Sequence, residues 1–324
     1  MAENPERLQL IQRAAKRLLN KLSETSPEAE PHGTSSKSAM EHMVSLSLRG
    51  RDAQSLDTQE NPPKPSVTAE QQKPALSRRT RLNIVQLRRL GMITPDNMTS
   101  AVSHDYRAIK RKLLANARDP QTRTLTNNLL MVTSALPSEG KTFTAMNLAL
   151  SLAAERDLHV LLIDGDVVNP SLTSLFEHEG KEGLTDLLNG NCKDVSEVLY
   201  RCEDLPNMSV IFSGNHDKNT PELLSSDRMT SLCLEMSKRY GDRIIIIDTP
   251  PVLACAEPAN IAMHVHHVIL VVAASHATRS QISAALENIA ACRSVSILLN
   301  KAPEWHKVNG ESYYYYQNQD VAAE

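Results

Sequence analysis

The feature that most limits how this chain can fold is a series of short, continuous apolar runs that alternate with helical patterns. Positions 244–247 are the extreme case, because they are four consecutive isoleucines. A strand without polar positions must be buried on both faces, as in a parallel sheet covered by helices. The sequence therefore predicts an α/β fold with a doubly wound, mostly parallel sheet. The predicted strands are 129–134, 159–164, 208–212, 243–248, 267–273 and 295–300.

Helical patterns fill the connections between these strands. They cover residues 140–154, 221–238 and 279–292, and a further helix is expected at 103–117, ahead of the first strand. Ligands of doubly wound sheets bind just outside the carboxyl ends of the strands. Residues that directly follow a predicted strand are therefore the first candidates for a functional site.

The first strand leads into a segment that matches a phosphate-binding loop. The pattern G-x-x-x-x-G-K-[ST] is met at Gly140, Lys141 and Thr142, whereas Ala135 replaces its first glycine. Lys141 would bring a positive charge to the β- and γ-phosphates, and the Thr142 hydroxyl would bind Mg²⁺. Because a G-K-T run between strand and helix also arises by chance, the neighbouring strands must support the assignment. The residues predicted to contact nucleotide are Ser138, Glu139, Gly140, Lys141, Thr142 and Phe143.

Polar side chains end three further strands. Asp164 and Asp166 close one strand as Asp-Gly-Asp, and Asp248 ends the isoleucine strand ahead of Thr-Pro-Pro. Paired acids beside a phosphate loop suit Mg²⁺ binding and proton transfer, although a lone aspartate after a strand is often a helix cap. Asp248 is expected to hold Mg²⁺ across from Thr142, as in a Walker B strand. Asn300 ends the last strand, where its amide would hydrogen-bond the adenine edge or serve as a turn residue.

Four of the seven tyrosines are consecutive near the end of the chain, at Tyr313, Tyr314, Tyr315 and Tyr316. Neighbouring residues of a strand point to opposite faces, and only polar and small residues follow, so these tyrosines do not form a core strand. The run is expected to be exposed, either as a sticky interfacial tail or as a set of phosphate acceptors. A neighbouring ATP site favours the acceptors.

The first 80 residues are predicted to lie outside the sheet. Residues 1–22 form a short basic amphipathic pattern, which is either a helix that docks on a partner or membrane surface or a marginal helix ahead of a linker. Residues 23–80 are rich in Ser, Glu, Gln, Thr and Pro and are predicted to be a disordered linker. The nucleotide-binding domain would then span 81–308, followed by a flexible tyrosine-rich tail at 309–324.

Composition excludes several classes of protein. The formal net charge of −3 gives no sequence-wide attraction to nucleic acid or anionic lipid, so no nucleic-acid partner is expected. The five cysteines are scattered and form no C-x-x-C pair, which argues against a disulfide framework and a zinc site and fits a reducing cytoplasm. No apolar run approaches the roughly 18 residues that would suggest a membrane span.

Taken in order, these motifs resemble those of the bacterial tyrosine kinases of exopolysaccharide and capsule assembly, and most of all their exosortase-associated autokinase branch. That family combines a Walker A loop, a Walker A′ motif of the form D-x-D, a Walker B strand ending D-x-P-P and a tyrosine-rich tail, and all four are present here. Each Walker motif alone is common among NTPases. The combination of Walker A′ with terminal tyrosines is far more specific.

The resemblance implies a P-loop protein-tyrosine autokinase that uses ATP and Mg²⁺, modifies its own terminal tyrosines and regulates exopolysaccharide synthesis and export. It also implies a homo-oligomeric ring in which neighbours phosphorylate one another. A transmembrane polysaccharide co-polymerase would recruit this cytoplasmic chain to the inner face of the membrane. The implied catalytic residues are Lys141, Asp164 (as the base) and Asp166, and the implied metal ligands are Thr142, Asp166 and Asp248.

The sequence departs from the family pattern in two places. Many members continue the A′ motif as D-x-D-x-R-x-P, but Val168 stands at the arginine position here. The family's oligomerisation helix carries E-x-x-R-x-x-R, whereas this chain offers His104, Arg107 and Lys110.

Two other functions fit part of the pattern. A partition- or septum-positioning ATPase shares the Walker motifs, but such proteins carry a signature lysine early in the loop, and no lysine lies between Ala135 and Gly140. A nucleotide-binding scaffold without kinase activity is the second alternative, which the two departures keep open. Detection of phosphotyrosine after incubation with Mg²⁺-ATP separates the kinase from both.

Overall fold

The computed structural model describes residues 43–47, 78–117, 127–178, 182–215 and 223–302. The predicted helix at 1–22 and the predicted tail at 309–324 lie outside these residues. In the described part of the chain, no helix is both long and apolar enough to cross a membrane.

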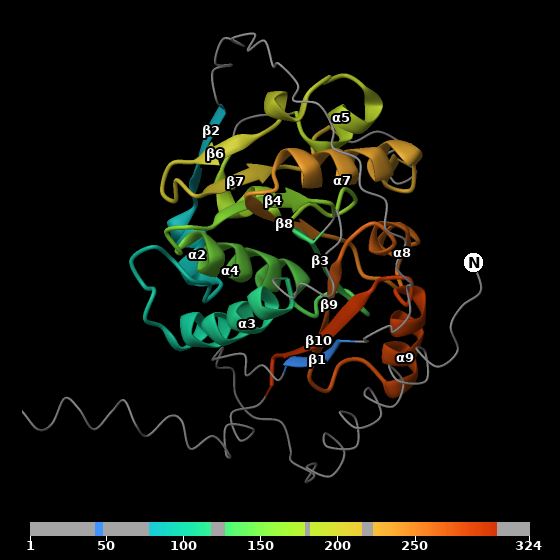
Figure 1. The fold of residues 1–324 in the computed structure, drawn as a ribbon. Coiled ribbons are helices and arrows are strands. Elements are labelled where there is room, and N and C mark those ends of the chain that lie inside the picture. Colours follow the sequence, from blue (N-terminus) through green and yellow to red (C-terminus); the bar gives the residue numbers. More distant parts are fainter. Residues whose placement is uncertain (1–42, 48–77, 118–126, 179–181, 216–222, 303–324) are drawn as a thin grey trace, which may run out of the picture.

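A ten-stranded sheet forms the centre of the molecule, with the strand order β1-β10-β9-β3-β8-β4-β7-β6-β2-β5 (Figure 1). The run from β10 to β7 is parallel throughout, and antiparallel pairs occur only toward the two ends of the described sheet. The strands are β1 (Met43–Ser47), β2 (Arg78–Leu82), β3 (Leu129–Ser134), β4 (His159–Asp164), β5 (Phe176–Glu177), β6 (Tyr200–Cys202), β7 (Met208–Ile211), β8 (Arg243–Asp248), β9 (His267–Ala273) and β10 (Ser294–Asn300).

Helices cover both faces of this sheet (Figure 1). Along β3, Leu129 and Met131 join one buried cluster and Leu130 and Val132 join the other. Helices α2, α3 and α4 pack on the second cluster, and α5, α7, α8 and α9 pack on the first. The helices are α2 (Ile84–Arg89), α3 (Ala101–Ala117), α4 (Lys141–Ala153), α5 (Leu184–Asn189), α7 (Asp227–Arg239), α8 (Glu257–Ala262) and α9 (Arg279–Asn288), with 3₁₀ turns η2 (Leu172–Leu175) and η3 (Val195–Glu197).

The predicted fold class is therefore confirmed: a doubly wound, mostly parallel α/β sheet. Strands β3, β4, β8 and β9 have the predicted bounds, and β7 and β10 differ by one residue. Helix α7 starts later than the predicted 221, because the Ser226 side chain accepts a hydrogen bond from the Met229 N–H and caps the helix there. Helix α9 ends at Asn288 rather than at 292.

Strand β1 and the first three residues of β2 fall within the segment 23–80 that was predicted to be a linker. Strand β1 pairs antiparallel with β10, and β2 pairs with β6 and β5. Strand β2 reads Arg-Arg-Thr-Arg-Leu and pairs near one edge of the sheet, so it does not need the apolar composition that identifies a central strand. The described part of the nucleotide-binding domain therefore includes residues 78–80, ahead of the predicted start at 81.

The register of the central strands brings the candidate acids together. Asp164 at the end of β4 is the register partner of Asp248 at the end of β8. Strand β3 pairs with the other side of β8, where Val132 is opposite Asp248. The phosphate loop that follows β3 and the three aspartates therefore share one edge of the sheet.

Candidate nucleotide-binding site

The phosphate loop turns at its middle and not at its first residue. Ser138 has a φ of 64° and Gly140 a φ of 98°, so these two residues take the left-handed conformations. Ala135 is fully buried and is not among the described residues with positive φ. An alanine therefore fits where the motif has its first glycine, because this position needs no left-handed backbone.

Two features of the structure require glycine at position 140: its left-handed backbone and a side chain that lies close to it. It is the N-cap of α4, and a Cβ at this position would lie 2.1 Å from Asn300 Nδ2. The Asn300 amide donates to the Glu139 carbonyl at 2.9 Å, and its own oxygen accepts from Lys301 N at 2.9 Å. Asn300 thus attaches the end of β10 to the phosphate loop, and adenine contact by this residue stays a prediction.

Glu139 holds the loop from inside. Its side chain is buried, and its two carboxylate oxygens accept from Leu136 N at 2.7 Å and from Ala273 N at 3.2 Å. Burial raises the pKa of Glu139, which the backbone donors partly oppose. The carboxylate therefore ties the loop to itself and to the end of β9, facing away from the space where phosphate would bind.

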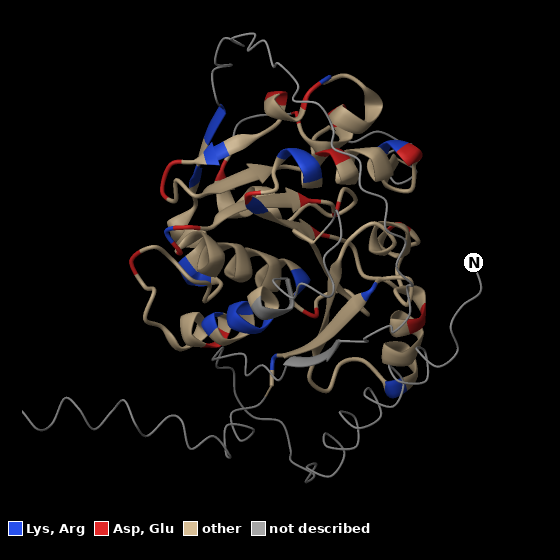
Figure 2. Cartoon of the chain, in the orientation of Figure 1, with Lys and Arg blue, Asp and Glu red and all other residues tan. Residues whose placement is uncertain are grey.

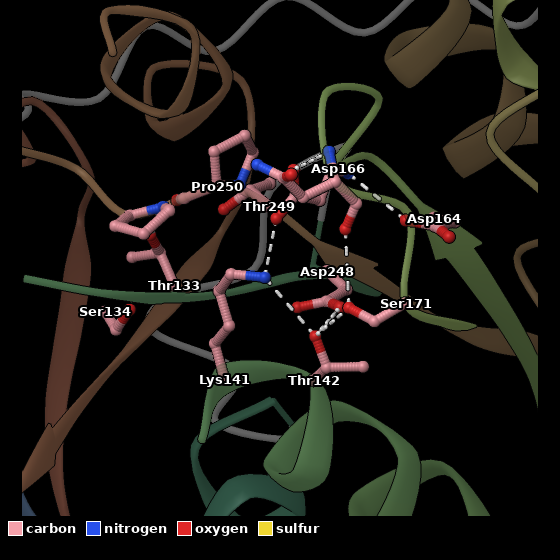
Figure 3. Close-up of polar contacts among 12 residues, drawn as sticks. Thr133, Ser134, Lys141, Thr142, Asp164, Asp166, Ser171, Asp248, Thr249 and Pro250 are labelled. Atoms are coloured by element: carbon pink, nitrogen blue, oxygen red, sulfur yellow. Dashed lines mark hydrogen bonds and ion pairs between the residues drawn. The ribbon is translucent and has the colours of Figure 1, made fainter. Parts of the chain in front are cut away.

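The charged centre of the site joins the loop to two strand ends (Figure 3). Lys141 Nζ lies 2.7 Å from Asp166 Oδ2, with the two side chains 12% and 3% exposed. Thr142 donates from Oγ1 to Asp248 Oδ2 at 2.6 Å, and Ser171 Oγ lies 3.3 Å from the same hydroxyl. A cation, two hydroxyls and two carboxylates thus converge at the start of α4, where a helix N-terminus already favours anions.

Burial and mutual repulsion shift the ionisation of this centre. Burial raises the pKa of Asp248 to about 6, although Lys141 and the Thr142 hydroxyl act to lower it. Burial by itself would lower the pKa of Lys141, but the charges of Asp248 and Asp166 more than compensate and raise it. Lys141 is therefore a cation throughout the physiological range, and Asp248 takes up a proton in mildly acidic solution.

Asp164 lies next to the other acids but forms no hydrogen bond or ion pair with Lys141 or Thr142 in the described chain. Figure 3 shows its carboxylate at the right of the view, to one side of Lys141 and Asp248, and the residue is 0% exposed. One oxygen accepts from Asp166 N at 3.2 Å, and the other has no hydrogen-bond partner in the described part of the chain. Burial, followed by the nearby charges of Asp248 and Asp166, raises the pKa of Asp164 well above its usual range.

A pocket of about 620 Å³ opens in front of the charged centre. The loop, the A′ segment and the segment after β8 each supply part of its wall. Asp166 is among the lining residues, whereas Asp164 and Asp248 lie beneath them. The lining comprises Pro137, Ser138, Gly140, Lys141, Thr142, Phe143, Asp166, Val168, Asn169, Ser171, Pro250, Pro251, Ala254 and Cys255.

The donor set fits Mg²⁺ bound together with phosphate. Asp248 Oδ1 is buried without a hydrogen-bond partner in the described chain, and the Thr142 hydroxyl lies beside the same carboxylate. No three His, Cys, Asp or Glu side chains among the described residues converge to hold a metal alone. A small, hard cation that takes its remaining ligands from phosphate and water matches this arrangement.

Sequence reasoning identified the acids and the loop but missed two features. Ser171 enters the site beside Thr142, and its only sequence signal is its place after the A′ segment. The inward direction of the Glu139 carboxylate was also not predicted, because it depends on Ala273, 134 residues away along the chain.

This fold and site define a P-loop nucleotide-binding domain. A family model described as an AAA domain matches residues 138–300, about half of the chain. The match contains the loop from Ser138 onward, all three aspartates and Asn300.

Similar proteins narrow the class. Tyrosine-protein kinase YwqD of Bacillus subtilis (strain 168) is 32% identical over 244 residues, which cover 75% of this chain and 97% of YwqD. Tyrosine-protein kinase etk of Escherichia coli (strain K12) is 30% identical over 223 residues, covering 66% of this chain but 29% of etk. The solved kinase domain of Escherichia coli tyrosine kinase ETK matches with a TM-score of 0.56 and 29% identity, over 68% of this chain and 82% of that domain. The chain belongs to the bacterial tyrosine-protein kinases.

Proposed function

We propose that this kinase transfers the γ-phosphate of ATP to Tyr313, Tyr314, Tyr315 and Tyr316 of its own tail, and that this modification regulates exopolysaccharide or capsule synthesis and export. The observation that carries the nucleotide part is the pairing of Lys141 with Asp166 beside the Thr142–Asp248 hydrogen bond. Lys141, Thr142 and Asp166 line one pocket at a helix N-terminus, with Asp248 beneath it, and phosphate and Mg²⁺ would replace the internal partners there.

Each group at the site has a distinct proposed task. Lys141 would bind the β- and γ-phosphates, and Thr142, Asp166 and Asp248 would hold Mg²⁺, which when bound would supply positive charge to the transferred phosphate. The tyrosine oxygen then forms its bond to the γ-phosphorus while the bond to the β-phosphate oxygen breaks and ADP leaves.

The proton of the tyrosine hydroxyl passes to Asp164 in this scheme. A raised pKa and an oxygen without a hydrogen-bond partner in the described chain are properties that suit a proton acceptor. Because Asp164 is buried beneath the pocket, the Gly165-Asp166 segment must move before the hydroxyl can reach it. We infer that this movement accompanies release of Asp166 from Lys141 when nucleotide binds.

Assembly into a homo-oligomeric ring is the second part of the proposal. Several Lys and Arg positions lie on α3, where the ribbon is coloured blue in Figure 2. Of the three positions that correspond to the family's oligomerisation motif, Lys110 is buried and pairs with Glu155 at 2.5 Å, while Arg107 donates to the Met98 carbonyl at 2.9 Å. His104 is exposed. A ring would therefore use the exposed face of α3 and not Lys110.

A transmembrane polysaccharide co-polymerase is the proposed partner that brings the kinase to the inner face of the cell membrane. This part rests on the resemblance of the motifs to the polysaccharide-assembly kinases. It predicts that the chain fractionates with membranes only when that partner is present.

The test of the tail assignment mixes two full-length variants. One carries Lys141→Met and keeps its tyrosines, and the other is active but has Phe at positions 313–316. We expect phosphate on the Lys141→Met subunit, placed mainly at 313–316 by mass spectrometry. An unlabelled mixture, or phosphate mainly elsewhere, contradicts transfer between neighbours to the tail. Absence of any phosphotyrosine on the unmodified chain with Mg²⁺-ATP would instead favour a nucleotide-binding scaffold.

A further inference from the structure

Val168 is an exposed apolar residue in the wall of a pocket that otherwise suits phosphate. Its side chain is 59% exposed, although it lies two residues from the buried Asp166 and lines the same pocket. A valine side chain gains nothing from contact with water, phosphate or Mg²⁺. Its place in this wall therefore indicates that an apolar part of a ligand lies against it.

Other apolar residues extend the same surface. Pro250 and Pro251, which follow β8 and are largely buried, line the inner part of the pocket, and the exposed Ala254 lines it beside them. We call Val168, Pro250, Pro251 and Ala254 the apolar wall. Valine, proline and alanine have few or no side-chain rotamers to restrict, so a ligand that packs on them loses little conformational entropy.

The position of the apolar wall relative to the charged centre selects between two possible occupants, adenine and an aromatic acceptor. A P-loop lysine serves the β- and γ-phosphates, and Lys141 Nζ is 2.7 Å from Asp166 in the segment that continues to Val168. The apolar wall is therefore near the γ-phosphate. Adenine is at the opposite end of ATP, whereas the acceptor must approach the γ-phosphate directly.

We propose that the apolar wall binds the aromatic ring of the acceptor tyrosine and that Val168 is a specificity-determining residue of the kinase. This inference rests on the proposed function. The ring packs on Val168 and the prolines, and its hydroxyl points to the γ-phosphate and the D-x-D acids. Serine and threonine have no ring to fill this surface, so the contact also explains selection of tyrosine over other hydroxyl acceptors.

A binding experiment tests the wall independently of turnover. The probe is a fluorescent peptide with the sequence of residues 309–324, and the protein is the full chain with Ala at 313–316, so that its own tail offers no ring to the wall, loaded with ADP and Mg²⁺. Val168→Thr keeps the shape but replaces a methyl group by a hydroxyl, and Val168→Asp adds a charge. The matched controls are Val85→Thr and Val85→Asp, because Val85 is 78% exposed on α2, outside the pocket.

We expect Val168→Thr to weaken peptide binding roughly threefold and Val168→Asp at least about tenfold, since each makes the ring bury a polar group. The Val85 variants should bind the peptide like the parent. A peptide with serine in place of the four tyrosines should bind the parent more weakly and should no longer distinguish Val168 variants from it.

Three results would overturn the inference: equal binding of the tyrosine peptide by the Val168 variants and the parent, no binding by the parent, or an equal loss of ADP affinity in the Val168 variants. The last result would assign the apolar wall to the nucleotide. Transfer of γ-phosphate from ATP to the peptide, measured in parallel, tests the proposed function separately. Val168-dependent binding without transfer would support the wall and contradict the acceptor assignment of the tail.

Discussion

The centre and one end of the sheet are stabilised in different ways. Strands β3, β8 and β4 are mostly buried, with apolar central residues, and β8 and β4 each end in an acid of the site. Strands β6, β2 and β5 are short, and side-chain pairs support them. Arg78 contacts both Glu182 at 2.7 Å and the Tyr200 hydroxyl at 2.9 Å, and Arg81 pairs with Glu203 at 2.6 Å.

The difference separates stability from function. At the centre, apolar burial is strong enough to hold carboxylates whose ionisation opposes folding, so functional groups stand where they reduce stability. At the β6-β2-β5 end, exposed ion pairs contribute little and carry no reacting group. Substitutions of the charged residues at the centre should therefore change activity strongly, and substitutions in the exposed ion pairs at this end should change neither activity nor stability by much.

The largest effect is expected from Lys141→Met. Without its charge the β- and γ-phosphates lose their direct cation, so tyrosine phosphorylation should fall below detection while the circular dichroism spectrum stays native. The matched control is Lys238→Met, at an exposed position near the end of α7, which should phosphorylate normally. Phosphorylation by the Lys141→Met chain alone would refute the site.

Substitutions of Asp164 and Asp248, the two acids at strand ends, should affect different steps of the reaction. Asp164→Asn should lower the rate of phosphoryl transfer by about 10²–10⁴-fold with little change in Mg²⁺-ATP affinity, as expected for loss of a base. Asp248→Asn should weaken Mg²⁺-dependent nucleotide binding itself. Single-turnover rates and titration with a fluorescent nucleotide measure the two effects. An equal loss of nucleotide binding in both variants would exclude Asp164 as the base.

Asp248→Asn should also stabilise the nucleotide-free chain at neutral pH. The pKa of Asp248 is raised to about 6 in the folded state, so the folded state binds more protons than the unfolded state between about pH 4 and 6. Stability from this residue is present at low pH and is lost as pH rises through about 6. Measured by urea unfolding at pH 8, the free energy of unfolding of the variant should exceed that of the parent by on the order of 2–3 kcal/mol. This difference should become smaller toward pH 4. No advantage at pH 8 would mean that Asp248 is not destabilised by ionisation.

Glu139→Gln tests the two hydrogen bonds that the Glu139 carboxylate accepts inside the phosphate loop. The amide keeps one acceptor oxygen and leaves either the Leu136 or the Ala273 N–H without a partner, so ADP affinity should fall about tenfold. Glu257→Gln is the control, because Glu257 is a buried glutamate outside the loop. Unchanged ADP affinity in Glu139→Gln would show that the loop keeps its shape without this carboxylate.

The smallest effect is expected at the peripheral end. Arg78→Ala removes an ion pair whose side chains are 36% and 44% exposed, and it also removes the guanidinium that lies over the Tyr200 ring. The free energy of unfolding should therefore change by less than about 1 kcal/mol. Phosphorylation should be unaffected. A loss of activity in Arg78→Ala would contradict the claim that the exposed ion pairs at the β6-β2-β5 end play no part in function.

The same contrast explains how far sequence reasoning reached. The inner part of a central strand must be apolar, as the four isoleucines of β8 are, so its bounds and its terminal Asp248 were predictable. Strand β2, with three arginines in five residues, has no such requirement and was assigned to a linker. At the site, Lys141 and Thr142 follow from local motif spacing. The burial of Asp164 and the entry of Ser171 depend on how separate segments pack, which local patterns do not encode.

The ion pair between Lys141 and Asp166 has a thermodynamic consequence for the order in which ligands bind. Nucleotide must separate this pair, which leaves Asp166 without its cation beside Asp164 and Asp248. On the proposed function Mg²⁺ would offset that repulsion, so nucleotide and Mg²⁺ would each bind more tightly in the presence of the other, and linkage makes the two effects equal. Free ATP and free Mg²⁺ should therefore each bind this site more weakly than the Mg²⁺-ATP complex does.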